Sequence, residues 1–214
     1  MKKFLFAVAL MTATALSAQN SISIRGGVNW RGISVENRGT VNEVRSFDFV
    51  GFNIGLHTSH RLSTHSQWHT SIQSGILLTT KGQSREMSVA GETPIYAHNL
   101  MYLQVPIHFA YIIEPLARFG TRPIRIIFNA GPYLAYGIGG SLEINGERLD
   151  GHRVFGNDID QLKPFDFGFT IGLGVETGRV FAGFSRDMGI ANISNINNDR
   201  YRNRVSSFTM GYRF

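Results

Sequence analysis

Alternation of apolar residues with small or polar residues is the feature of this sequence that most constrains its fold. The clearest segment covers residues 165–176, whose apolar positions are Phe165, Phe167, Phe169, Ile171, Leu173 and Val175. Glycine, threonine and acidic residues fill the positions between them. Because successive side chains of a β-strand point to opposite faces, this period of two predicts strands with one apolar face.

The same alternation recurs along the chain. It ends the sequence, in residues 206–214, and it appears within residues 22–30, 50–56 and 68–78. Three further segments, at about 99–113, 123–137 and 179–187, are also typical of strands. The sequence therefore predicts an all-β protein with eight strands.

The face opposite the apolar one decides between two all-β architectures. It carries glycine, asparagine, glutamine, histidine and charged residues. In a soluble sandwich, the alternative, this polar face would point outward and bulky apolar side chains would fill the interior. An apolar exterior around a polar interior is the transmembrane arrangement. We therefore predict an eight-stranded antiparallel up-and-down transmembrane β-barrel.

The first residues resemble a secretory signal. Lys2 and Lys3 precede an apolar stretch at 4–10 and small residues up to Ala18. The apolar stretch is shorter than the roughly 20 residues of a spanning helix. We expect a signal peptide at 1–18, with cleavage after Ser17 as the alternative, and one barrel domain at 19–214. This organisation predicts export to the cell outer membrane.

Composition excludes several classes of protein. The chain has no cysteine, which rules out disulfides, thiolate metal sites and a lipid-anchored N-terminus. Its formal charge of +6 is mild and no dense basic tract is present, so we expect no nucleic-acid partner. The glycine runs at 137–140 and 172–174 do not open a helix after a strand, so they predict no dinucleotide site, and no other cofactor is expected.

The connections between the predicted strands alternate in length. Short ones are expected near 60–66, 115–122 and 177–178, and long ones near 31–46, 82–94, 139–164 and 188–203. Membrane barrels have short periplasmic turns and longer external loops. Four loops and three turns, with both termini periplasmic, require eight strands.

The last residues are similar to the C-terminal signal that the barrel-assembly machinery recognises, and we expect that machinery to be a partner. The outward residues of this signal are Phe208, Met210, Tyr212 and Phe214. Thr209 stands where the signal usually has glycine.

Four stretches resemble the PorT-like outer-membrane β-barrel family, whose architecture is related to the small OmpA and OmpX barrels. The stretches are 102–106, 130–134, 165–176 and 188–193. Gln104 stands where the family usually has glutamate. The resemblance implies a possible accessory role in protein export by type IX secretion, with secretion-system proteins as partners.

The interior of an eight-stranded barrel is nearly filled by side chains, so an open porin channel is not expected. We predict a lumen network of Arg25, Gln104, Arg125, Asp166, Glu176 and Arg213, accompanied by Asn53, Gln73, Tyr102 and Asn129. The expected role is structural or interactive, not enzymatic. Export accessory, small-solute channel and lipid A-modifying enzyme are the alternatives. Residues 192–195 resemble a lipid A deacylase motif only superficially, because no histidine precedes them.

Two further side-chain groups are candidate sites. His57 and His69 would face each other across a hairpin centred on Ser63, close enough to share a metal. A polar, pH-sensitive turn without metal is the favoured alternative. A row of arginines at the outer interface would point outward with lipid-facing residues of the same parity. It consists of Arg186, Arg200, Arg202 and Arg204. Guanidinium groups bind phosphate in a bidentate way, so this row predicts a lipopolysaccharide site, with solvated loop charges as the alternative.

Overall fold

The computed structural model describes residues 20–37, 40–44, 50–65, 67–86, 95–115, 118–145, 147–148, 153–159, 161–196 and 199–214. The signal peptide predicted for 1–18 lies outside the described residues. No helix among the described residues is long and apolar enough to cross a bilayer.

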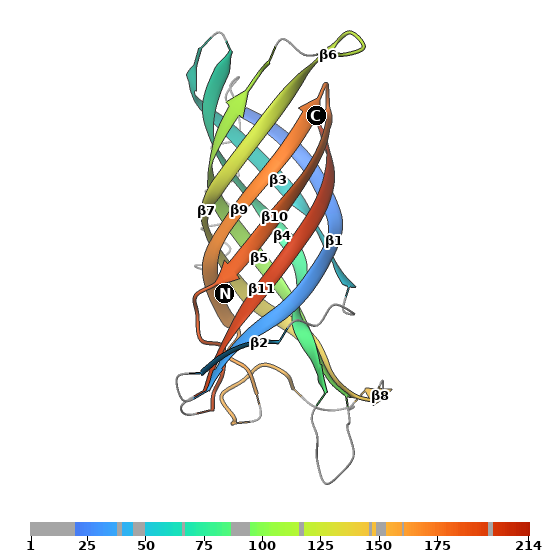
Figure 1. Ribbon diagram of the computed structural model, residues 1–214, viewed down its shortest axis with the longest axis vertical. Helices are drawn as coiled ribbons and strands as arrows, with labels where there is room; N and C mark the ends of the chain where they lie inside the picture. The colour runs from blue at the N-terminus through green and yellow to red at the C-terminus, as the bar shows by residue number, and fades with distance from the viewer. Residues whose placement is uncertain are drawn as a thin grey trace.

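Eight long antiparallel strands wrap into a tall barrel (Figure 1). They are β1 (Asn20–Asn37), β3 (Val50–Thr64), β4 (Trp68–Glu86), β5 (Ile95–Ile113), β7 (Arg122–Ile144), β9 (Phe165–Thr177), β10 (Val180–Gly189) and β11 (Asp199–Arg213). Three short strands extend this ring: β2 (Thr40–Val44), β6 (Arg118–Phe119) and β8 (Glu147–Arg148). The eight-stranded antiparallel barrel predicted from the sequence is confirmed.

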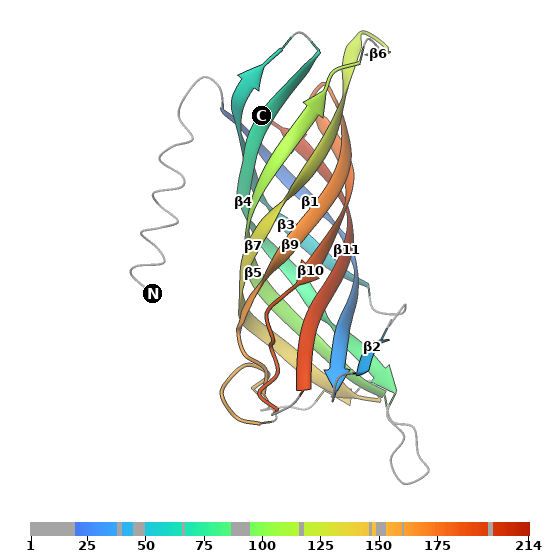
Figure 2. The ribbon, with the colours of Figure 1, turned by 60° about the vertical axis from the view of Figure 1, so that its left-hand side comes forward.

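Pairing between the first and last strands closes the ring. β11 pairs with β1 from Ser23↔Arg213 to Asn37↔Asp199, and every other long strand pairs with its neighbours along the chain. The two strands lie side by side in Figure 2 as well. A closed ring leaves no long strand with an unpaired edge, which is the condition for crossing a membrane with β-structure.

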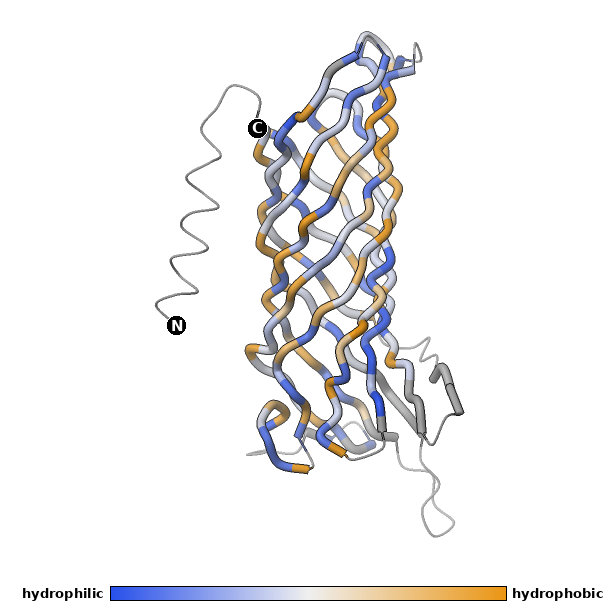
Figure 3. The backbone as a smooth tube through the Cα atoms, turned by 90° about the vertical axis from the view of Figure 1, so that its left-hand side faces the viewer, coloured by the Kyte–Doolittle hydropathy of each residue, from blue (hydrophilic) through white to orange (hydrophobic). Residues whose placement is uncertain are grey.

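The apolar face of each strand points outward. Along β9, exposed and buried positions alternate almost without interruption, and the exposed ones include Leu173 and Phe167. Figure 3 shows hydrophobic and hydrophilic positions alternating along the strands. The inward residues of β9 are small or polar, as the period-two pattern predicts. Elsewhere, larger buried side chains such as Tyr102, Tyr133 and Ile127 also face the interior.

The two ends of the barrel differ. We call the end that carries the β3–β4, β5–β7 and β9–β10 connections and the C-terminus the turn end; it is uppermost in Figure 1. The opposite end, which carries the longer connections, is the loop end. The β9–β10 turn consists of Gly178 and Arg179, one residue later than predicted, and Gly178 has a φ of 60°. Glycine adopts this left-handed conformation without steric cost.

At the loop end, strand pairing continues further than the sequence predicts. β1 reaches Asn37, β4 reaches Glu86 and β7 reaches Ile144, although loops were expected from about 31, 82 and 139. The β4–β5 ladder continues as far as Glu86↔Ile95. The strict apolar alternation fades there, but backbone pairing does not require it, so the strands continue as paired hairpins beyond the predicted strand ends.

Candidate functional site

A buried ion pair crosses the lumen towards the loop end. Lys81 on β4 and Asp166 on β9 lie 2.9 Å apart (Nζ to Oδ2), and both side chains are 0% exposed. The hydroxyl of Tyr133 donates to the same carboxylate oxygen at 3.3 Å, and Nδ2 of Asn203 donates at 2.9 Å. Four strands therefore supply one charged layer, and its hydrogen bonds offset the cost of removing two charges from water.

Aromatic rings surround the cation of this layer. The Lys81 ammonium lies 4.0 Å from the ring centroid of Tyr133 and 5.2 Å from that of Tyr102. A cation is attracted to the face of an aromatic ring within about 6 Å. Both rings are buried, so they fill the lumen cross-section around the ion pair.

An apolar cap covers the ion-pair layer on its loop side. Val154 and Leu162, from the β8–β9 connection, and Ile193, from the β10–β11 connection, are buried in one cluster with barrel residues. The barrel members of the cluster are Ile33, Leu100, Tyr102, Tyr133 and Ala135. Backbone hydrogen bonds join the connections, with Lys163 N donating to Ile193 O at 2.8 Å.

Phe155 anchors the cap to the barrel wall. Its ring packs edge-on against Tyr102, with centroids 5.3 Å apart. A Cβ at Gly137 would clash with the Phe155 ring, so the bare backbone of this glycine makes room for the anchor. The packing of Phe155 therefore explains why position 137 is glycine, and no ligand is needed to explain it.

Asn195 joins the two connections, and Asn192 holds the β10–β11 connection in its local conformation. Asn195 Nδ2 donates to the carbonyl oxygens of Gly156 and Gln161 at 2.9 and 3.1 Å. Asn192 Oδ1 accepts from the backbone N–H groups of Ser194 and Tyr201 at 3.1 and 2.9 Å. These roles account structurally for the 192–195 stretch, which has a superficial resemblance to a deacylase motif.

The middle of the lumen holds neutral networks and one further acid. Asn29 Oδ1 accepts from Asn53 at 2.6 Å and from Ser207 at 2.8 Å. Asp187 accepts from Gln104 Nε2 at 2.9 Å and from the Thr170 hydroxyl at 2.8 Å. These bonds leave a cavity of about 70 Å³ beside them. The networks satisfy buried polar groups across several strands.

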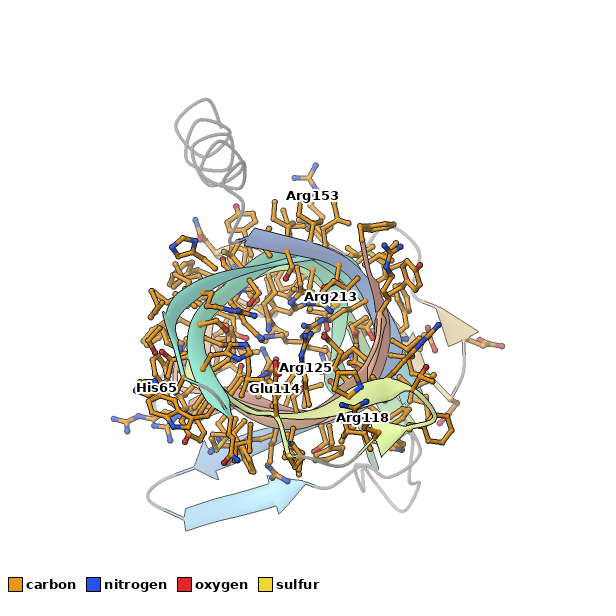
Figure 4. The ribbon with its side chains drawn as sticks, turned by 90° about the horizontal axis from the view of Figure 1, so that it is seen from above. His65, Glu114, Arg118, Arg125, Arg153 and Arg213 are labelled. Carbon is orange, nitrogen blue, oxygen red and sulfur yellow. The ribbon has the colours of Figure 1, made fainter. Side chains whose placement is uncertain are left out.

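A second charged cluster lies at the turn end. Arg125 pairs with Glu114 at 2.8 Å and with Glu176 at 2.7 Å, and Arg213 pairs with Glu176 at 3.2 Å. Seen from the turn end, Arg125, Glu114 and Arg213 point into the ring (Figure 4). A cavity of about 260 Å³ lies among these groups.

The six residues predicted as a lumen network lie in the lumen, but not as one network. The structure brings Arg125, Glu176 and Arg213 together at the turn end, and Arg25 lines the cavity beside them. Gln104 and Asp166 belong to separate layers nearer the loop end.

Sequence reasoning missed several central members of these layers: Lys81, Tyr133, Asp187 and Asn203. Parity was the signal that could have found them. Thr79 and Lys81 share the inward face of β4. The alternation predicted within residues 68–78 would have included Lys81 if it had been extended by three residues.

The arginine row lies on the outer side of β10 and β11. Arg200, Arg202 and Arg204 have the parity of the outward residues Phe208 and Met210. Arg186 is exposed on β10, where it pairs with Ser206, and Met188 pairs with Arg204. Arg186 and Arg204 are therefore diagonal neighbours on adjacent strands, which is within reach of long side chains.

The predicted pairing of His57 with His69 is wrong. His57 pairs with Gly75 and His69 pairs with Thr64, because the hairpin turns later than expected and β3 has a register shift between Arg61 and Ser63. In the described part of the chain, no three histidine, aspartate or glutamate side chains are grouped so that they could hold a metal ion. The geometric argument for a shared metal is thereby removed.

Comparison with known proteins matches the sequence to one family model. A family model described as outer membrane protein beta-barrel domain matches residues 17–195. No curated protein matches the sequence. The Ail attachment invasion locus protein of Yersinia pestis is similar in structure, with 12% identity, a TM-score of 0.39, and coverage of 92% of this chain and 99% of that chain.

Two further solved structures are similar at the same level. Neisserial surface protein A has 12% identity and a TM-score of 0.39, with coverage of 90% of this chain and 97% of that chain. OprG from Pseudomonas aeruginosa has 12% identity and a TM-score of 0.37, with coverage of 91% and 96%. The family match rests on sequence and spans more than half of the chain.

Proposed function

Because the chain belongs to the outer membrane protein β-barrel family, we propose that it serves as a closed, non-enzymatic barrel with a structural or interaction role. The family places the protein in the outer membrane. Short turns of such barrels face the periplasm and longer loops face outward. The turn end is thus assigned to the periplasm and the loop end to the exterior.

The buried Lys81–Asp166 layer is the observation that carries this proposal. Both side chains are 0% exposed, and Tyr102 and Tyr133 pack around them. The apolar cap lies on the loop side of this layer, and its side chains cannot hydrogen-bond to water. An ion that crossed the barrel would have to displace both. The cap and the ion-pair layer therefore hold the loops against the barrel. A fixed set of loops is what a surface for partners requires.

Conductance in planar bilayers tests the closed barrel. The wild-type protein is expected to show no steady porin-like current under conditions in which a general porin conducts. The variant Tyr102→Ala/Tyr133→Ala removes two buried rings around the ion pair and should conduct measurably. Tyr136→Ala, at an exposed outward position, is the matched control and should remain silent. A porin-sized current from the wild-type protein would refute the proposal.

A role in protein export remains a prediction of the PorT-like resemblance. Co-occurrence of the gene with type IX secretion components, and loss of secretion when the gene is deleted, would support that role. Normal secretion in the deletion strain would contradict the export role, and the structural or interaction role would then stand alone.

A further inference from the structure

The cavity at the turn end is lined by an excess of cations. Its volume is about 260 Å³, and it is lined by Arg25, Arg61, Arg125 and Arg213 from four different strands. Glu176 is its one lining carboxylate. A water molecule needs roughly 10–15 Å³ of such a volume, so the cavity has room for a hydrated small ion.

In the part of the chain that the structure describes, two of these four arginines form ion pairs. Glu114 and Glu176 are engaged by Arg125 and Arg213. Among the described residues, no carboxylate forms an ion pair with Arg25 or Arg61. Arg25 and Arg61 therefore line one cavity without a direct ion-pair partner in the described ranges, although the charge of Glu176 still acts on Arg25. A charge without a direct partner away from bulk water is costly.

Arg25 is held in a fixed position at the inner wall of this cavity. Its guanidinium carbon lies over the Phe181 ring, 4.0 Å from the ring centroid. Its Nε is buried and has no hydrogen-bond partner among the described residues. The side chain is anchored by stacking, and its donors remain available to a ligand.

Ser71 supplies a second, independent sign of a missing ligand. This residue lines the same cavity, is 1% exposed, and its buried hydroxyl oxygen has no hydrogen-bond partner among the described residues. Buried polar groups in folded proteins are nearly always hydrogen-bonded, to protein or to a bound molecule. A neutral donor thus lines the same cavity as two arginines that have no direct ion-pair partner among the described residues.

We propose that this cavity binds a small oxyanion of the phosphate or carboxylate class, held by Arg25 and Arg61 with Ser71 as a neutral donor. Guanidinium groups present a planar fork of donors that matches two oxygens of such an anion. The anion enters from the periplasmic side, since the cavity lies at the turn end. The ion-pair layer and the cap separate it from the exterior.

Titration of the purified, folded protein in detergent tests the site, with inorganic phosphate in one arm and malonate in the other. The buffer holds ionic strength constant with chloride. Calorimetry is expected to detect saturable binding of at least one anion, and the thermal midpoint should rise with its concentration. Arg25→Gln and Arg61→Gln should each weaken binding by about ten-fold or more, because each removes charged hydrogen bonds.

Arg153→Gln is the matched control, because Arg153 is exposed and lies outside the ring (Figure 4). It should bind the anion as the wild-type protein does. If Arg25→Gln fails to fold, Arg61→Gln and Ser71→Ala still test the cavity. Absence of saturable binding in both arms, or equal affinity in the wild-type, Arg61→Gln and Ser71→Ala proteins, would overturn the site. Equal weakening by Arg153→Gln would also overturn it, since that result indicates diffuse surface charge.

Discussion

At the scale of single residues, the charge of Lys81 and the charge of Asp166 stabilise each other, because neither side chain has contact with solvent. Lys81→Met or Asp166→Asn alone leaves one buried charge without its partner, which costs about 3–5 kcal/mol of unfolding free energy. The double variant Lys81→Met/Asp166→Asn removes both charges and should recover most of that loss. Reversible urea unfolding in detergent micelles measures all three variants.

Lys163→Met provides the control for this cycle, because Lys163 is exposed in the β8–β9 connection. Its unfolding free energy should change by about 0.5 kcal/mol or less. If the losses of unfolding free energy in the two single variants add up to the loss in the double variant, the two charges are not coupled. That result would contradict the proposed ion-pair layer.

At the element scale, parity predicted the faces of the strands but not what lies between or beyond them. Arg25 and Glu176 could be assigned to the lumen because regular strands alternate. Val154 and Ile193 could not be assigned to a core, since irregular connections carry no period. The partner of His57 was predicted wrongly mainly because the β3–β4 hairpin turns later than Ser63, after Thr64, and the bulge between Arg61 and Ser63 shifts the register by one further position.

The outer arginines on β10 and β11 are proposed to bind lipopolysaccharide phosphates. Arg186→Gln/Arg202→Gln/Arg204→Gln should reduce lipopolysaccharide co-purification. It should also lower the thermal midpoint by several degrees in lipopolysaccharide but not in plain detergent, since charged hydrogen bonds contribute about 1.5–3 kcal/mol each. Gel analysis of bound lipopolysaccharide and thermal melts measure the two effects.

Arg118→Gln/Arg122→Gln is the comparison for the arginine row. These exposed residues lie at the turn end, which is assigned to the periplasm, away from lipopolysaccharide. Their replacement should leave co-purification unchanged. If the triple variant retains as much lipopolysaccharide as the wild-type protein, the row consists of ordinary loop charges.

For the whole molecule, closure of the ring depends on the last strand. β11 pairs with both β10 and β1, and the backbone N–H of Phe214 donates to Ile22 O at 3.0 Å. The Phe214 side chain points outward, 70% exposed, and its ring lies 5.8 Å from that of Tyr212. Recognition of this terminal aromatic pair by the barrel-assembly machinery remains a prediction from the sequence.

Deletion of Phe214 is expected to leave the protein in the periplasm, because the machinery would lack the terminal ring. Cell fractionation and heat-modifiable migration on a gel measure insertion and folding. Phe165→Ala is the control: this outward ring on β9 is 51% exposed, compared with 70% for Phe214, and its loss removes about 1.5–3 kcal/mol of apolar burial without touching the signal. It should reach the outer membrane normally. Normal outer-membrane levels of the Phe214 deletion would show that this ring contributes only lipid contact.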